Sequence, residues 1–293
     1  MKKKTENPIS YEEFQNPPTQ YRGFPFWAWN SKLEKDELER QIEVFQSMGF
    51  GGFHMHVRQG LETRYLGEDF LNSVAVCVKK AEELGMYAFL YDEDRWPSGA
   101  AGGFVTKNKM FRLKYLEMTG CDCADSYPDE KIAAENGGCL FVAAFAVETD
   151  SDGYMTSYRK IGREEDAADK RYFFIRVAPG NEPRYNYQSY TDTLSTEAMN
   201  EFIKITHETY YNRFSEQFGK RIPAIFTDEP QTIRTVSPDN GFSQKSAHIA
   251  WTFDFAESFK KEYGYDVTEK LPELFFFMRS SGGFKTRYDV RRH

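Results

Sequence analysis

The sequence predicts an α/β protein of the (β/α)8 TIM-barrel type, with apparently only the first four βα units and an antiparallel β insertion after the third strand. Three observations predict this fold. Apolar segments of strand length alternate with amphipathic helices, the connections between them are short, and polar side chains follow each predicted strand. Strands that alternate with helices indicate parallel βαβ units. Barrels and open α/β sheets carry their active sites at these strand ends.

The chain is expected to begin with a polar, proline-containing arm over residues 1–20, which lies on the surface. A first strand is predicted over residues 21–29 and a first helix over 32–47. Ser31 and Glu34 have the spacing of a capping box, and an apolar stripe follows them. These signals predict one complete βα unit.

The second and third units follow the same pattern. The sequence predicts a strand over 50–58, a helix over 69–84 and a third strand over 86–92. Residues 93–103 are too rich in glycine and proline to form either element. The strands are apolar on both faces, as parallel strands covered by helices should be.

The alternation stops near residue 104. Apolar runs separated by Gly, Asn, Asp and Pro turn signals predict an antiparallel β insertion over 105–190. A helix over 196–218 and a fourth strand over 222–227 then resume the α/β pattern. After that strand we expect a helix near 246–263, a short helix near 271–278 and no further strand.

This pattern divides the chain into four predicted segments. They are the arm 1–20, a first part of the barrel over 21–104, the β-rich insertion 105–190, and a truncated barrel continuation over 191–293. A half barrel exposes the edge of its sheet, and exposed edges pair with other chains. We therefore expect self-association through that edge, or pairing with a missing C-terminal half.

Composition excludes several classes of protein. The 293 residues carry a net charge of −7, which argues against a broad nucleic-acid-binding surface. No apolar run reaches the ~18 residues of a membrane-spanning helix, and no apolar segment marks a signal peptide, so a cytoplasmic location is expected. The four cysteines, Cys77, Cys121, Cys123 and Cys139, are expected as buried or idle thiols in a reducing compartment.

The strongest candidate site follows the fourth strand, where Asp228 and Glu229 stand before Pro230. A general acid at a glycosidic oxygen is a carboxylic acid whose pKa is raised in a partly apolar pocket. Phe226 and the other aromatic residues, which make up 16% of the chain, can supply such a pocket. The alternative is structural, because an acidic residue before proline often only starts a helix.

An acidic loop follows the third strand, with Asp92, Glu93, Asp94 and Trp96. Sugar rings stack their apolar faces on tryptophan, while acidic groups bind the hydroxyls. The same acids could instead bind Ca²⁺, because hard cations take several oxygen ligands. A solvated acidic turn is the third interpretation.

The second strand carries His54, His56 and Arg58 on one face, because side chains alternate along a strand. We expect them to recognise hydroxyl groups. Zn²⁺ binding by the His-x-His pair and a purely structural role are the alternatives.

The first strand ends in Trp27, Trp29 and Asn30, and the two tryptophans share a face. This cluster predicts either a sugar subsite at the mouth of the barrel or two rings of the core.

Several of these segments resemble glycoside hydrolase family 106, the α-L-rhamnosidase-like proteins. The resemblance covers about residues 20–278 and lies in PFWAWN, GFGGFHMHVRQGLETRYLGEDF, YDEDRWPSGAAGG, YTDTLSTEAMNEFIKITHETYY, AIFTDEPQ and FDFAESFKKEYGYDVTEKLPELF. It implies a (β/α)8 domain that hydrolyses glycosidic bonds, often in bacterial degradation of plant or pectic polysaccharides. The best-known members look calcium-dependent and inverting.

The resemblance places the acid/base at Glu229, with Asp228 as a neighbour that orients it. It also implies a second carboxylate from later strands, and common glycosidase mechanisms need two. We therefore expect a glycoside hydrolase fragment that is inactive alone. The alternatives are a non-catalytic carbohydrate-binding remnant and a metal-dependent hydrolase that uses His54 and His56.

Overall fold

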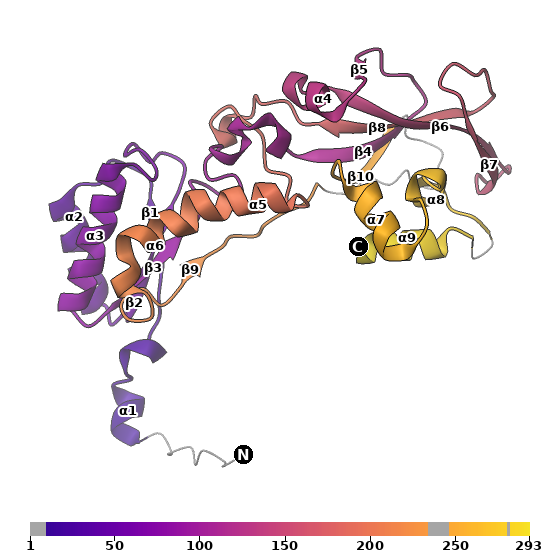
Figure 1. The fold of residues 1–293 in the computed structure, drawn as a ribbon. Helices are drawn as coiled ribbons and strands as arrows, with labels where there is room; N and C mark the ends of the chain where they lie inside the picture. Colours follow the sequence, from indigo (N-terminus) through magenta and orange to yellow (C-terminus); the bar gives the residue numbers. More distant parts are fainter. Residues whose placement is uncertain (1–9, 234–245, 280–281) are drawn as a thin grey trace. The chain divides into compact units, whose positions relative to one another are not determined.

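A computed structural model describes residues 10–233, 246–279 and 282–293. The chain forms two compact units (Figure 1). The first comprises residues 1–102 and 201–230, and the second comprises 103–200 and 231–293. This division differs from the predicted one, because residues 231–293 group with the β-rich segment and not with the parallel strands.

The first unit is built on a parallel sheet with the strand order β1 (Phe26–Trp29), β2 (Gly52–Val57), β3 (Tyr87–Tyr91) and β9 (Ile225–Phe226). Helix α2 (Lys35–Ser47) connects β1 to β2, and α3 (Glu68–Glu83) connects β2 to β3. The predicted α/β fold is therefore confirmed. Within the described residues β1 and β9 are the edges of an open sheet, so the structure does not show a closed barrel.

One face of this sheet packs on α2 and α3, which lie side by side (Figure 1). In β2 the alternate residues Phe53, Met55 and Val57 are buried. The residues between them, His54 and His56, contact the rings of the opposite face instead. The period-2 alternation of the strand thus separates an apolar core from a face of histidines and aromatic rings.

The N-terminal segment differs from the prediction in two details. Helix α1 (Tyr11–Gln15) and a 3₁₀ turn at Thr19–Tyr21 precede β1, so the predicted strand 21–29 begins too early. The predicted capping box of α2 is wrong, because Glu34 caps that helix without a side-chain hydrogen bond. The Leu33 N–H donates instead to Thr63 Oγ1, in the loop after β2.

The predicted helix 196–218 is one helical run of several parts. It consists of α5 (Thr196–Ile203), a π-helical turn (Lys204–Glu208), α6 (Thr209–Phe214) and a 3₁₀ turn (Ser215–Gln217). In the first unit, the Tyr210 hydroxyl donates to the Tyr91 carbonyl at 3.0 Å. Arg213 donates to Glu68 and Asn72 of α3. These contacts join α6 to β3 and α3.

The second unit contains a mostly antiparallel sheet with the order β10 (Ser246–Ala250), β4 (Lys114–Thr119), β8 (Lys170–Val177), β6 (Cys139–Thr149) and β5 (Ser126–Tyr127), while β7 (Met155–Ile161) also pairs with β6. The predicted helix 246–263 is wrong in its first part. Residues 246–250 form β10, which pairs with β4, and only α7 (Phe255–Tyr263) is helical. The expectation of no strand after the fourth is therefore also wrong.

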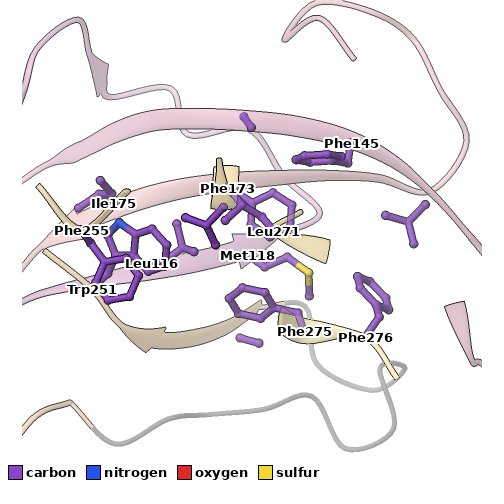
Figure 2. Packing of buried hydrophobic residues seen from close by; sticks show 14 of the residues in the cluster. Leu116, Met118, Phe145, Phe173, Ile175, Trp251, Phe255, Leu271, Phe275 and Phe276 are labelled. Atoms are coloured by element: carbon purple, nitrogen blue, oxygen red, sulfur yellow. The ribbon is translucent and has the colours of Figure 1, made fainter. Parts of the chain in front are cut away.

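The core of the second unit explains why the C-terminal segment belongs to it. Figure 2 shows the sheet residues Leu116, Met118 and Phe173 packed against Trp251 and Phe275. Trp251 precedes α7, and Phe275 is the last residue of α8 (Pro272–Phe275). Helix α9 (Phe284–Arg292) follows α8. The rings of Trp251 and Phe275 bury the apolar face of the sheet. Leu116 and Met118, which pack with them, lie more than a hundred positions earlier in the sequence.

The cysteines also differ from the prediction. Cys123 and Cys139 form a disulfide, which corrects the expectation of four thiols. The pair lies at the start of β6 beside Phe174 of β8, a contact set by the sheet and not by spacing along the chain. Cys77 is a buried thiol whose pKa is raised by that burial, and Cys121 is exposed.

Candidate functional site

Carboxylates gather at the C-terminal ends of β3 and β9, two neighbouring parallel strands. Tyr91 pairs with Phe226 in the register of these strands, and the Asp92 N–H donates to the Phe226 carbonyl. The residues that follow, from Asp92 onward and from Thr227 onward, therefore leave the sheet side by side. The structure thus brings together the acidic loop and the Asp-Glu pair that the sequence analysis selected.

Asp92 is fully buried and bonded on both oxygens. Oδ1 accepts a hydrogen bond from Ser98 Oγ, and Oδ2 accepts one from Thr227 Oγ1, each at 2.6 Å. His207 Nε2 lies 3.6 Å from Oδ2. Burial raises the pKa of Asp92, while the hydrogen bonds from Ser98 and Thr227 oppose that shift. Both oxygens of this carboxylate face protein donors, an arrangement that does not favour the predicted role of Asp92 as a substrate ligand.

Glu93 is also fully buried, and it organises the loop after β3. Its two oxygens accept the backbone N–H groups of Asp94, Gly99, Ala100, Ala101 and Gly102. Burial raises the pKa of Glu93 to about 8, although these N–H groups act to lower it. The oxygens of Glu93 are thus surrounded by the loop backbone, an arrangement that does not favour its predicted role as a substrate ligand.

Asp94 and Trp96 lie further along the same loop. Asp94 is buried and forms an ion pair with Arg95 at 2.7 Å. Trp96 is half-buried, and its indole N–H donates to Glu229 Oε2 at 3.0 Å. The loop therefore presents one ring to the exposed carboxylate at the end of β9.

Asp228 and Glu229 have different surroundings. Asp228 Oδ2 accepts a hydrogen bond from the Tyr91 hydroxyl at 3.3 Å, and His56 Nε2 lies 3.8 Å away. Burial raises the pKa of Asp228 and the Glu229 charge adds to this, whereas the Tyr91 hydrogen bond and Arg58 lower it. Glu229 is exposed. No helix begins between residues 228 and 233, so the helix-start alternative is not what the described residues show.

The second strand presents its polar residues on one face, as the alternation predicts. His54 stacks on Phe89 with ring centres 4.5 Å apart, and His56 stacks on Tyr91 at 4.1 Å. Burial lowers the pKa of His54, and lowers that of His56 to about 4. Both rings are therefore neutral near pH 7. Arg58 is exposed, with Nη1 3.3 Å from His56 Nε2.

In the first strand the structure favours the second of the two alternatives for the tryptophans, two rings of the core. Trp27 and Trp29 share a face, but it is the face that packs on the helices. Trp27 contacts Phe45 of α2, and Trp29, 1% exposed, contacts Phe70 of α3. Both rings belong to the core, where they lie away from the strand-end carboxylates. Asn30 is exposed at the end of β1.

The described residues do not fit a metal centre. No group of three or more His, Cys, Asp or Glu side chains in this part of the chain is arranged to hold an ion. The oxygens of Asp92 and Glu93 accept protein hydrogen bonds, and the two histidines stack on neighbouring rings. These residues therefore support neither the Ca²⁺ site implied by the resemblance nor a His-x-His Zn²⁺ site.

Sequence reasoning missed four members of this cluster, namely Tyr91, Ser98, Thr227 and His207. Pairing β3 with β9 in parallel would have placed Thr227 beside Asp92. The sequence contains no comparable signal for His207, because a regular helix was expected where the structure has a π-helical turn.

These features define a mixed α/β protein with a polar cluster at the strand ends of a parallel sheet. The fold is similar to that of the solved rhamnosidase from Novosphingobium sp. PP1Y, with a TM-score of 0.54 and 14% sequence identity. The match covers 96% of this chain and 44% of that protein, so the chain spans less than half of its length. No protein-family model matches the sequence. No curated protein matches it either. Within the described residues, no helix has the length and apolar character needed to cross a membrane.

Proposed function

We propose that this chain carries part of the catalytic centre of a glycoside hydrolase of the α-L-rhamnosidase-like family 106. Its substrates would be plant-type or pectic oligosaccharides. The observation that carries this proposal is the exposed Glu229 carboxylate at the end of β9, oriented by the Trp96 indole and flanked by Asp228. The fold similarity to a rhamnosidase supports the same class.

In this proposal Glu229 is the general acid that protonates the leaving glycosidic oxygen. Trp96 binds one carboxylate oxygen of Glu229, which fixes the direction in which the other oxygen points. Asp228 acts as the orienting neighbour, because its own side chain turns toward Tyr91 and His56. Asn30 and Arg58 are exposed at the C-terminal ends of β1 and β2 and are the proposed hydroxyl ligands.

Glycoside hydrolysis by the common mechanisms uses two carboxylates on opposite sides of the scissile bond. Asp228 and Glu229 are adjacent in one segment, so they do not supply both sides. We propose that the second carboxylate comes from outside the four parallel strands, in the part of the whole protein that completes the site.

One observation favours a second candidate, a carbohydrate-binding remnant without catalysis. Of the acidic residues selected at these two strand ends, Asp92, Glu93 and Asp94 are buried and only Glu229 is exposed. A single exposed carboxylate beside a tryptophan can bind sugar hydroxyls without hydrolysing the glycosidic bond.

The test uses the protein encoded by the complete reading frame and an α-L-rhamnoside with a poor, unactivated leaving group. Glu229→Gln should lower kcat by about 10²–10⁴-fold, the usual contribution of a general acid. Glu82→Gln, an exposed residue of α3, is the matched control and should retain wild-type turnover. Unchanged kcat in Glu229→Gln would remove Glu229 from the role. Calorimetric sugar binding without any hydrolysis would favour the remnant.

A further inference from the structure

We propose that Asp92 is the positioning residue of this site, which holds the Asp228–Glu229 segment in place through Thr227 and Ser98. The inference rests on the proposed function, and it assigns a role to a carboxylate that touches no substrate. It also explains why a buried acid directly follows β3, while the neighbouring strand β9 is followed by the exposed one.

Hydrogen bonds connect Asp92 to the segment that carries Glu229. Thr227, which directly precedes Asp228, donates to Asp92 Oδ2 at 2.6 Å. Ser98 donates to Asp92 Oδ1 at 2.6 Å, and its Oγ accepts the Asp228 N–H at 2.9 Å. The Ser98 N–H donates in turn to the Asp228 carbonyl at 2.8 Å. The backbone on the N-terminal side of Glu229 is therefore tied to one carboxylate by two routes.

Burial of the Asp92 carboxylate has a cost in free energy that its partners must offset. A buried carboxylate is retained only where hydrogen bonds or charges compensate for its lost hydration. Asp92 has 0% exposure, and its compensating donors come from the loop after β3 and from the end of β9. His207 Nε2 approaches from the π-helical turn, and such turns recur at functional sites. Three separate segments of the first unit therefore meet at this one side chain.

Glu229 has an unusual backbone conformation. Its φ is +43°, in the left-handed region that is uncommon for residues other than glycine. Such a conformation persists where the surrounding structure fixes it. The bonds from Asp92 to Thr227 and Ser98 fix the residues immediately before Glu229. The Trp96 indole N–H holds the Glu229 carboxylate itself.

The loop that carries Trp96 is organised by the neighbouring buried acid. Glu93 gathers the N–H groups of residues 99–102, and Ser98 links that loop to Asp92. The loop and the end of β9 are thus held in register with each other. Loss of the Asp92 bonds should move Glu229 relative to Trp96 without removing either group.

The experiment compares Thr227→Val with Thr227→Ser in the complete protein. Thr227 is itself exposed, so valine meets no packing obstacle there, although the buried Asp92 then loses one of its two hydroxyl donors. Valine keeps the branched shape but removes the donor to Asp92, so kcat should fall by about tenfold or more while KM stays within about twofold. Serine keeps the donor and should restore kcat to within about twofold. Thr156→Val, an exposed β7 threonine bonded to the Glu148 carbonyl, is the matched control.

A second measurement does not depend on activity. The indole ¹H–¹⁵N signal of Trp96, assigned with Trp96→Phe, reports its hydrogen bond to Glu229. This signal should shift in Thr227→Val and Ser98→Ala and stay in place in Thr227→Ser. The indole signal of Trp27, which donates to Gln41 in the core, should not move in any of them.

The two measurements separate failure of the inference from failure of the proposed function. If the wild-type protein hydrolyses no glycoside but Thr227→Val shifts the Trp96 signal, the proposed function fails and the positioning role stands. If Thr227→Val has wild-type kcat and an unshifted Trp96 signal, the positioning role is overturned. A loss of kcat that Thr227→Ser does not restore would also overturn it.

Discussion

The two units of this protein each bury a carboxylate, and they use it differently. In the second unit Asp192 is buried beside Lys114, with Nζ to Oδ2 at 3.0 Å, and it also accepts a hydrogen bond from Thr252. In the first unit Asp92 is buried and accepts hydrogen bonds from the Ser98 and Thr227 hydroxyls. Thr227 lies two residues before the exposed Glu229. Burial of a charge therefore does not by itself mark a functional site. What distinguishes Asp92 from Asp192 is that one of its hydrogen-bond donors belongs to the segment that carries an exposed carboxylate.

The largest expected effect on stability is in the second unit. Asp192→Ala leaves the buried Lys114 ammonium without its carboxylate, so the free energy of unfolding should fall by about 3–5 kcal/mol. Denaturant titration measures this loss. Well below the unfolding midpoint, the Trp96 indole signal should stay unchanged. A shifted Trp96 signal would show that Asp192 also serves the site and would break the comparison.

The next expected effect is a pH dependence of stability that comes from Glu93. Its pKa rises from 4.5 to about 8 on folding, so the folded state binds the proton more tightly. The contribution of Glu93 to the free energy of unfolding is fully present below about pH 4.5 and is lost as the pH rises to about 8. Glu93→Gln should flatten the fall in unfolding free energy between these values, as measured by urea titrations. Glu82→Gln should keep the wild-type slope, and an unchanged slope in Glu93→Gln would contradict the assignment.

The smallest expected effect concerns the edges of the parallel sheet. Strands β1 and β9 are edges in the described residues, and the exposed Phe26 lies beside His54 and Phe226 on the face away from α2 and α3. We expect the 293-residue chain made alone to self-associate in light scattering. Ala28→Lys in β1 should reduce that association, because edge lysines oppose strand pairing. A clean wild-type monomer would count against the half-barrel interpretation.

The sequence predicts the first unit better than the second, for a physical reason. The elements up to residue 92 follow from local apolar patterns and short connections, and the structure has a strand or helix in each predicted place. β10 pairs with β4, which is more than a hundred residues away. The residue pattern around β10 is typical of a helix and contains no sign of this partner strand. The Cys123–Cys139 disulfide lies beside the pairing of β5 with β6, and the cysteine pattern alone does not predict it.

The candidate site shows the same limit at the level of single side chains. The alternation of predicted strands and helices correctly places Asp92 and Asp228 at the ends of strands, which are neighbours in the sheet. It cannot tell whether a carboxylate turns outward to a ligand or inward to backbone N–H groups, which depends on how the loop closes over Glu93. Likewise, alternation puts Trp27 and Trp29 on one face but does not say that this face packs on the helices.

The central claim is that Glu229 donates a proton to the leaving oxygen. The most direct test is how the effect of Glu229→Gln on kcat depends on the leaving group. The measurement compares kcat of wild type and Glu229→Gln in the complete protein, on rhamnosides with good and with poor leaving groups. A poor leaving group needs the proton more, so Glu229→Gln should lose about 10²–10⁴-fold on it and far less on an activated aryl group. Equal losses on both substrates would contradict the account.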